Sequence, residues 1–313
     1  MNTAGIYVHI PFCKSKCIYC DFYSVAGQDN RFENFINALI HEIETYQVNT
    51  AKWVFDTIFI GGGTPSLLNA YQMDKIISAL NKKIDLGKIK EFTIEVNPGE
   101  APNEKLKDFY SIGINRLSIG VQSFKSELLQ FLSRIHSAKD VLKTFQSAHD
   151  AGFENINCDL IYNIPGQSLE DWQDDLDTLV NLNPEHISAY SLTVEKNTRL
   201  FELVKNNSVA MPIDNLHEHF NTLTLSTLIK NNYIQYEISN YSKPDRECLH
   251  NLHYWENNYY LGFGPSAHSY DGKKRWNNFS NLDKYISLLE NGKSPIENYD
   301  DITEIQKFNE LTR

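Results

Sequence analysis

The strongest constraint on the fold of this chain is its alternation of short apolar segments with amphipathic ones. Apolar spacing with a period of two predicts strands, and spacing near 3.6 predicts helices. The expected strands cover 5–10, 56–60, 91–96, 116–121, 155–161 and 186–194. The expected helices lie near 32–43, 73–80, 102–113 and 141–148. A fifth helix is expected to begin in a capping arrangement at Ser168. Six such units predict an α/β fold with a parallel sheet and helical crossovers.

Periodicity alone does not separate an open, doubly wound sheet from a full or partial barrel. In either architecture the ligand-binding loops lie at the carboxyl ends of the strands. The polar and glycine-rich motifs follow the strands, at 11–21, 61–66, 97–99 and 122–123. Their positions predict that they share one site.

Length, charge and hydropathy narrow the class of protein. The 313 residues suffice for one large domain or for a domain with an appendage. Forty acidic and 29 basic residues give a net charge of -11, which disfavours nucleic acid as a partner. No apolar run approaches the ~20 residues that span a bilayer, and the amino terminus lacks the basic start of a secretory signal. We expect a cytoplasmic protein without an intrinsic membrane anchor.

The strand-helix rhythm ends near residue 200. A helix is expected over 214–229, followed by an aromatic, glycine-rich stretch over 233–276 and a short helix over 282–289. We therefore expect two parts, an α/β barrel or sheet over 1–200 and a connecting and C-terminal segment over 201–313.

Three of the five cysteines lie within eight residues, with the spacing C-x3-C-x2-C. Cys13, Cys17 and Cys20 follow the first strand, so their thiolates can converge on one metal centre. A structural zinc site needs a fourth ligand, which would have to come from the distant Cys158 or Cys248. A four-iron cluster held by three thiolates leaves one iron open to another ligand. Three unrelated thiols are the remaining alternative.

With its C-x3-C-x2-C motif on the first loop, the chain resembles the radical S-adenosylmethionine (SAM) superfamily. The resemblance implies a partial (β/α)6 radical SAM barrel with a C-terminal extension. It also implies that Cys13, Cys17 and Cys20 hold a [4Fe-4S] cluster whose fourth iron binds SAM. The reduced cluster would then cleave SAM to methionine and a 5′-deoxyadenosyl radical, with the protein supplying orientation.

Further motifs resemble the oxygen-independent coproporphyrinogen III oxidase-like branch of this superfamily. Gly61-Gly62-Gly63-Thr64-Pro65 ends a strand, and its glycines let the backbone approach a ligand closely. The resemblance implies that residues at several strand ends contact SAM. An arginine among them suits the SAM carboxylate. The implied SAM-binding set is Tyr7, Tyr19, Gly62, Gly63, Thr64, Glu95, Gln122, Arg134 and Asp159. Each of these residues, taken alone, is also compatible with core packing, a tight turn or a solvated position.

Two departures favour one subfamily over another. True oxidases of this branch usually read C-x3-C-x2-C-x-C and carry an N-terminal extension. This chain has Phe22 at the last position of that motif, and only six residues precede Tyr7. Both features resemble HemW-type heme chaperones. Asn163 stands where relatives often carry glycine, which predicts a small difference in that loop.

The late segment His250-Asn251-Leu252-His253-Tyr254-Trp255 matches the H-N-x-x-Y-W signature of the HemW-type group. Imidazole is a common axial ligand of heme iron, so His250 is the candidate heme ligand, ahead of His253 and His268. The implied partner is a heme-acceptor protein. The alternative is an oxidase that converts coproporphyrinogen III to protoporphyrinogen IX, with a porphyrinogen as its substrate. A radical SAM enzyme acting on another substrate is the third reading, and no catalytic residue is assigned. Members of the group usually continue into a small C-terminal domain, which we expect this chain to lack.

Overall fold

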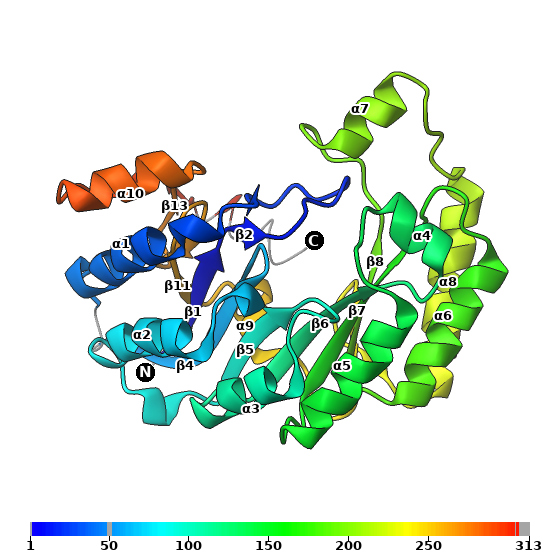
Figure 1. Cartoon of the computed structure of the whole chain (residues 1–313), viewed down its shortest axis with the longest axis horizontal. Helices are drawn as coiled ribbons and strands as arrows, with labels where there is room; N and C mark the ends of the chain where they lie inside the picture. The colour runs from blue at the N-terminus through cyan, green and yellow to red at the C-terminus, as the bar shows by residue number, and fades with distance from the viewer. Residues whose placement is uncertain (1, 49–51, 304, 307–313) are drawn as a thin grey trace.

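The computed structural model describes residues 2–48, 52–303 and 305–306 and is built around one twelve-stranded sheet (Figure 1). Six strands at its centre are parallel and stand in the order in which they occur along the chain. They are β1 (Asn2–Ile10), β4 (Trp53–Gly62), β5 (Glu91–Val96), β6 (Arg116–Gln122), β7 (Ile156–Tyr162) and β8 (His186–Ser191). The predicted strands are confirmed, except that β8 ends three residues earlier than expected.

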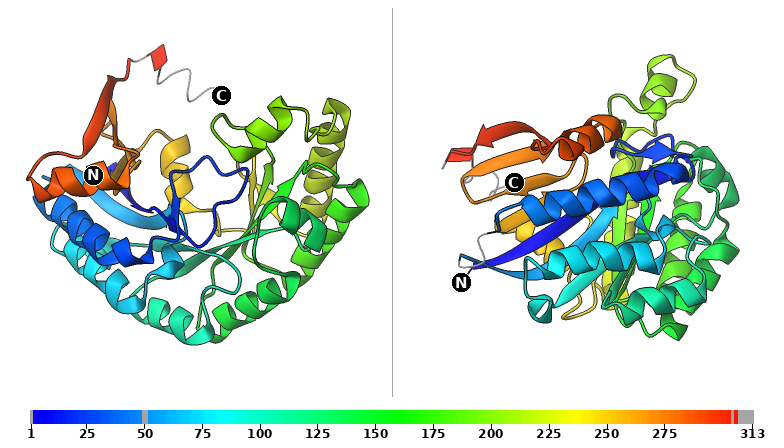
Figure 2. Two further views of the ribbon diagram at one scale, coloured as in Figure 1. Left: turned by 45° about the horizontal axis from the view of Figure 1, so that its top comes forward. Right: turned by 60° about the vertical axis from the view of Figure 1, so that its left-hand side comes forward.

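Helices cover the outer face of these strands. They are α1 (Phe32–Thr45), α2 (Ala70–Asn81), α3 (Asn103–Ser111), α5 (Ala138–Asp150) and α6 (Leu169–Leu182). Figure 2 shows the strands forming an open arc with these helices on its convex side. Sequential strand order places every right-handed crossover on the same face of the sheet. The arrangement is therefore a partial barrel, and the doubly wound alternative is excluded.

The two faces of the central strands differ in chemistry. Aliphatic side chains such as Ile58, Ile94 and Ile119 are fully buried in the main core with the helices. The alternating positions carry polar side chains, including Thr93, Ser118 and Asn157. Parallel strands covered on both faces are usually apolar throughout. The alternation therefore marks the concave face as a polar interior.

The later part of the chain extends the sheet at both ends. At one end β10 (Asn240–Ser242) pairs antiparallel with β8, and β9 (Ile234–Gln235) pairs with β10. At the other end β11 (Tyr259–Phe263) pairs parallel with β1, and an antiparallel run follows it. That run is β12 (His268–Tyr270), β13 (Lys274–Asn278) and β14 (Ile296–Asp301). The expected helices become α8 (Asp214–Lys230), which packs on α6, and α10 (Leu282–Glu290), which packs on α1.

Several short elements were not expected from the sequence. Three are helices: α4 (Ser126–Phe131), α7 (Arg199–Lys205) and α9 (Leu249–Trp255). A small parallel pair, β2 (Phe12–Cys13) and β3 (Val25–Ala26), frames the cysteine loop, and 3-10 turns occupy Asp29–Arg31, Pro65–Leu67 and Leu86–Lys88. Within the described ranges, no helix is long and apolar enough to cross a membrane.

A buried carboxylate fastens the extension to the barrel. Glu42 of α1 accepts hydrogen bonds from Tyr285 Oη (2.5 Å), Asn278 Nδ2 (2.6 Å) and the Gly264 backbone N–H (2.8 Å). Burial raises the pKa of Glu42 to about 7. The three donors come from α10, β13 and the loop after β11, so one side chain ties three parts of the extension to α1.

Candidate functional site

The cysteine loop lies at the carboxyl end of the parallel strands, as predicted. Cys13, Cys17 and Cys20 are free and partly buried. Burial raises the pKa of Cys20 to about 11, and the neighbouring Cys17 and Cys13 sulfurs act in the same direction. The three thiols therefore lie within electrostatic range of one another on one loop, and they offer the donor set that a cluster with three protein thiolates needs. No three His, Cys, Asp or Glu side chains in the described part of the chain converge closely enough to hold one metal ion. A four-iron cluster does not require such convergence, because each of its protein thiolates binds a different iron.

A second, smaller apolar core anchors this loop from above. Ile18 packs with Leu132 of the α4 region and with Leu200 of α7. The Leu200 backbone N–H also donates to the Ile18 carbonyl oxygen at 2.8 Å. In Figure 1, α7 projects beyond the sheet at the same end as the cysteine loop. The loop is thus held by packing against the α4 region and against α7.

The glycine segment after β4 runs directly against the cysteine loop. The backbone N–H groups of Gly63 and Thr64 donate to the carbonyl oxygens of Ile10 (2.8 Å) and Phe12 (2.7 Å). A Cβ at Gly63 would lie 2.5 Å from the Phe12 carbonyl oxygen, so only glycine allows this approach. Thr64 Oγ1 then lies 3.7 Å from Cys13 Sγ. The structure therefore brings Gly62, Gly63 and Thr64 beside the candidate cluster ligands.

Two acidic side chains and a tyrosine line the concave interior nearby. Glu95 Oε2 accepts the Gly62 N–H at 2.9 Å, which joins two residues of the predicted SAM set. Burial and the Asp159 carboxylate raise the pKa of Glu95 to about 8. Burial also raises the pKa of Asp159, which accepts hydrogen bonds from Ser118 and Asn157. Tyr7 donates to His9 Nδ1 at 3.0 Å. Burial raises the pKa of Tyr7, and the Glu95 charge adds a smaller effect in the same direction.

Arg134 reaches the cysteine loop from the segment between α4 and α5. Its Nη1 lies 3.6 Å from Cys17 Sγ, and its Nη2 donates to the Gly120 carbonyl oxygen at 2.7 Å. Gln122 ends β6 with a left-handed backbone (φ 66°), and its amide nitrogen and Arg134 both pack over Gly120. Burial raises the pKa of Tyr19, while the Arg134 charge opposes this increase. Most members of the predicted SAM set thus lie at the carboxyl end of the barrel, whereas Tyr7 and Asp159 lie further along β1 and β7, in its interior.

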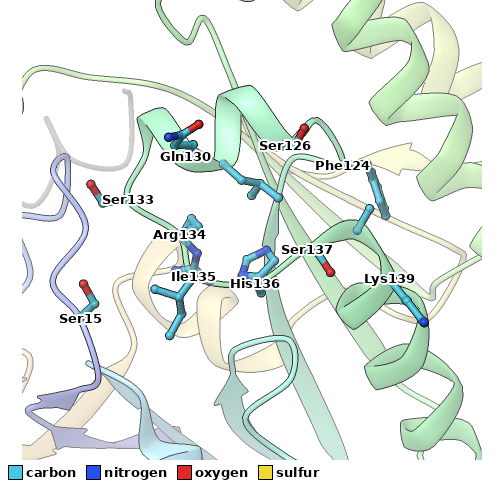
Figure 3. Close-up of a pocket in the computed structure, with 12 residues that line it drawn as sticks. Ser15, Phe124, Ser126, Gln130, Ser133, Arg134, Ile135, His136, Ser137 and Lys139 are labelled. Atoms are coloured by element: carbon cyan, nitrogen blue, oxygen red, sulfur yellow. The ribbon is translucent and has the colours of Figure 1, made fainter.

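A hollow of about 650 Å³ opens beside Arg134 (Figure 3). Ser15 of the cysteine loop lies on one side, and residues from 124 to 139 form the other. His136 lines the hollow and its Nε2 lies 3.0 Å from the Val121 carbonyl oxygen; burial lowers the pKa of His136 to about 4. The hollow therefore lies between the cysteine loop and the segment that runs from α4 to α5.

His250 lies deeper in the barrel, on α9, which packs against β1, β4 and β11. Its ring is 1% exposed, and both ring nitrogens have partners: Thr57 Oγ1 at 2.8 Å and Tyr254 Oη at 3.0 Å. Burial lowers the pKa of His250 to about 3, so the ring is neutral. A metal-ligand role for its Nε2 requires Tyr254 to move away. His253 is buried against Asp56, and His268 lies exposed on β12.

Asn97 belongs to the site although sequence reasoning named only its loop. Its side chain contacts Thr64, Arg134 and Glu100. The available signal was its position directly after β5, at the strand end where ligand loops gather. Asn163, at the position where relatives often carry glycine, has a φ of 64°, a left-handed conformation that asparagine tolerates better than most residues.

Comparison with known proteins identifies the class to which this barrel and loop belong. The family model of the radical SAM superfamily matches residues 7–179. A solved structure of coproporphyrinogen III oxidase (HemN) from Escherichia coli superposes with a TM-score of 0.84 at 23% identity, covering 99% of this chain and 74% of that one. At this identity the likeness concerns the fold.

More similar sequences narrow the class. The chain is 37% identical to heme chaperone HemW of Bacillus subtilis over 305 residues, which cover 97% of this chain and 80% of that protein. It is 38% identical to heme chaperone HemW of Escherichia coli over 269 residues, which cover 84% and 69% of the two chains. The chain therefore belongs to the radical SAM superfamily and, within it, to the family that contains these HemW proteins.

Proposed function

We propose that this protein is a heme chaperone that holds a [4Fe-4S] cluster and SAM at the mouth of the barrel and delivers heme to an acceptor protein. The observation that carries the cofactor part is the meeting of separate strand ends at one loop. Thr64 contacts Cys13, Arg134 contacts Cys17, and the Gly62 backbone N–H donates a hydrogen bond to Glu95. When bound, the cluster and SAM would supply one-electron chemistry. The chain's own residues would orient them and exclude water.

The kinship with HemW proteins supports the heme part, and His250 is its proposed ligand. Its Nε2 is held by Tyr254 and its other nitrogen by Thr57, so the ring has a fixed orientation before any ligand arrives. Release of Tyr254 would free Nε2 while Thr57 still holds the ring. Tyr254 would therefore act as a gate for the proposed ligand.

The second candidate is the oxidative decarboxylation of coproporphyrinogen III. The fold is compatible with it, because this chain superposes over 99% of its length on HemN of Escherichia coli. Phe22, which stands where oxidases usually carry a fourth cysteine, favours the chaperone. The Phe22 side chain is 63% exposed beside the cysteine loop.

Anaerobic cluster reconstitution followed by two parallel assays separates the candidates. Stoichiometric heme binding without turnover of coproporphyrinogen supports the chaperone. Efficient SAM-dependent decarboxylation would overturn it and establish the oxidase.

Two variants test the assigned residues. Cys17→Ala should abolish the brown cluster absorbance, whereas Cys158→Ala, a buried thiol on β7, should retain it; unchanged iron in Cys17→Ala refutes the ligand set. His250→Ala should alter the heme spectrum and weaken binding. His41→Ala, at an exposed histidine on α1, is the control and should leave the heme spectrum unchanged. An unaltered spectrum in His250→Ala removes that residue from the heme site.

A further inference from the structure

One carboxamide links the two side chains that donate toward the candidate cluster thiolates. Asn97 Oδ1 accepts from Arg134 Nη2 at 2.6 Å, and Asn97 Nδ2 donates to Thr64 Oγ1 at 2.9 Å. Arg134 and Thr64 in turn lie 3.6 Å from Cys17 Sγ and 3.7 Å from Cys13 Sγ. The amide therefore joins two contacts that reach two different cysteines.

The orientation of the Asn97 amide follows from its partners. A guanidinium group has donors only, so the Asn97 atom that faces Arg134 must be the oxygen. The nitrogen then faces the other two partners, Thr64 and the Glu100 carboxylate, which lies 3.0 Å away. Because a carboxylate accepts, this second contact independently requires the nitrogen on that side.

This orientation directs the donors at the sulfurs. The Asn97 N–H occupies a lone pair of Thr64 Oγ1, so the threonine hydroxyl hydrogen is free to point toward Cys13. Arg134 Nη2 is engaged by Asn97 and the Gly120 carbonyl oxygen, which leaves Nη1 toward Cys17. Without the amide, the threonine hydroxyl could rotate and the guanidinium would lose one of its two fixed acceptors.

A further contact ties the arrangement to the cysteine loop itself. Glu100, whose side chain is only 4% exposed, lies 3.5 Å from Lys14 Nζ, the residue directly after Cys13. Glu100 therefore accepts from the second N–H of Asn97 and pairs with the Lys14 side chain of the loop at once. Asn97 and Glu100 are therefore linked to the cysteine loop without being candidate cluster ligands themselves.

We propose that Asn97 is a positioning residue that aims the Thr64 hydroxyl and the Arg134 guanidinium at Cys13 and Cys17, and thereby raises the reduction potential of the cluster. The inference rests on the proposed cluster. Hydrogen bonds to the sulfurs of a cluster favour its more negative, reduced state. Loss of the amide should therefore make the cluster harder to reduce.

The decisive measurement is an anaerobic redox titration of the reconstituted full chain. Asn97→Ala should retain the iron content of the unaltered chain but lower the midpoint potential. The expected change in the reduction equilibrium is about fivefold, or about 40 mV for one electron. Asn97→Asp keeps the acceptor for Arg134 and loses the donor to Thr64. A potential that is unchanged in Asn97→Ala at full iron content overturns the proposal.

Two further variants separate aiming from general damage. Thr64→Val removes the hydroxyl donor and should lower the potential, whereas Thr64→Ser keeps it and should restore the potential. Asn97→Ala should lower the midpoint potential less in the Thr64→Val background than in the unaltered chain, because the Thr64 hydroxyl that Asn97 orients is already absent. Fully additive shifts would contradict an action through Thr64.

A metal-free measurement covers the case in which Asn97→Ala does not take up iron. The apo chain is alkylated with iodoacetamide at one pH, and each cysteine is quantified by peptide mass spectrometry. In Asn97→Ala, the alkylation rates of Cys13 and Cys17 relative to that of Cys20 should differ from the same ratios in the unaltered chain. Equal ratios in the two chains overturn the proposal. Failure of the proposed cluster site is distinguishable, because the unaltered chain would then bind no cluster at all. Failure of the heme part is distinguishable too, because the unaltered chain would then bind the cluster but not heme.

Discussion

The raised pKa of Glu95 makes the stability of the cofactor-free protein depend on pH. Burial and the Asp159 charge move this pKa from an ordinary 4.5 to about 8. The folded state therefore holds the Glu95 proton more tightly than the unfolded state does. The stability contributed by the protonated group is complete below about pH 4.5 and is lost as the pH rises through about 8. Between these limits, unfolding becomes easier with increasing pH.

The size of this effect has an upper limit set by the two pKa values. One pH unit of separation corresponds to about 1.4 kcal/mol, so the separation at Glu95 allows at most about 5 kcal/mol. The Glu95 side chain is partly open to the barrel interior, where water and the Gly62 N–H stabilise the charged form. We therefore expect about 1–3 kcal/mol between pH 5 and pH 8.

Urea unfolding of the apo protein at pH 5, 6, 7 and 8 measures this contribution. Glu95→Gln cannot ionise, and its oxygen can still accept the Gly62 N–H. The free energy of unfolding of Glu95→Gln should rise relative to that of the unaltered chain by about 1–3 kcal/mol from pH 5 to pH 8. Glu127→Gln, at an exposed position on α4, should follow the unaltered chain at every pH. A constant difference between Glu95→Gln and the unaltered chain would refute the reasoning.

Two stability predictions concern buried packing, one beside His250 and one between α6 and α8. Gly5→Ala would place a Cβ 2.8 Å from the His250 ring, so it should destabilise the protein by about 1–3 kcal/mol. The double variant Gly5→Ala/His250→Ala should cost less than the sum of its parts in chemical denaturation, and strict additivity would contradict the contact. Thr224→Val leaves the buried Trp172 Nε1 without its 2.9 Å acceptor and should lower the free energy of unfolding by about 1–3 kcal/mol. Thr222→Val, exposed on the same helix, is the control, and equal losses in both variants would refute the assignment.

Most of the barrel could be predicted because its information is local. Each central strand is a short apolar run, and helices such as α5 and α6 carry an apolar stripe and a capping box. The three missed helices have only six or seven residues, which is less than two full turns of pattern. In α9 the buried side chains include His250 and His253, so no apolar stripe announces it. Strands β11 and β10 of the extension are equally hidden, because their partners β1 and β8 lie far away in sequence.

The site could be predicted as a location better than as a set of contacts. The rule that ligands bind at the carboxyl ends of parallel strands brought the cysteine loop, Gly62 and Glu95 together correctly. The rule does not reveal which polar groups bond to each other. Asn97 acquires its role from Arg134, which is 37 positions away and comes from a loop with no regular periodicity. The burial of His250 likewise depends on Thr57 and Tyr254.

Glu91 connects the two halves of the proposed site. It lies on β5, the strand that also carries Glu95, and its carboxylate accepts the N–H groups of Leu249 (2.9 Å) and His250 (3.0 Å) at the start of α9. The buried Arg116 lies 3.9 Å away and supplies the opposite charge. A carboxylate at a helix amino terminus satisfies N–H groups that have no partner within the helix. The position of the proposed heme ligand is therefore set from the strand that lines the proposed SAM site.

Glu91→Gln should consequently disturb α9 more than its small change in shape suggests. The amide cannot replace both oxygens as acceptors, and it removes the ion-pair partner of the buried Arg116, at a cost of about 3–5 kcal/mol. Adding Arg116→Met removes the uncompensated charge, so the double variant should regain part of the lost free energy of unfolding. Heme titration of both variants then separates the causes. If the double variant recovers stability but not heme affinity, the cap itself positions His250; if Glu91→Gln alone unfolds as the unaltered chain does, neither the cap nor the ion pair stabilises α9.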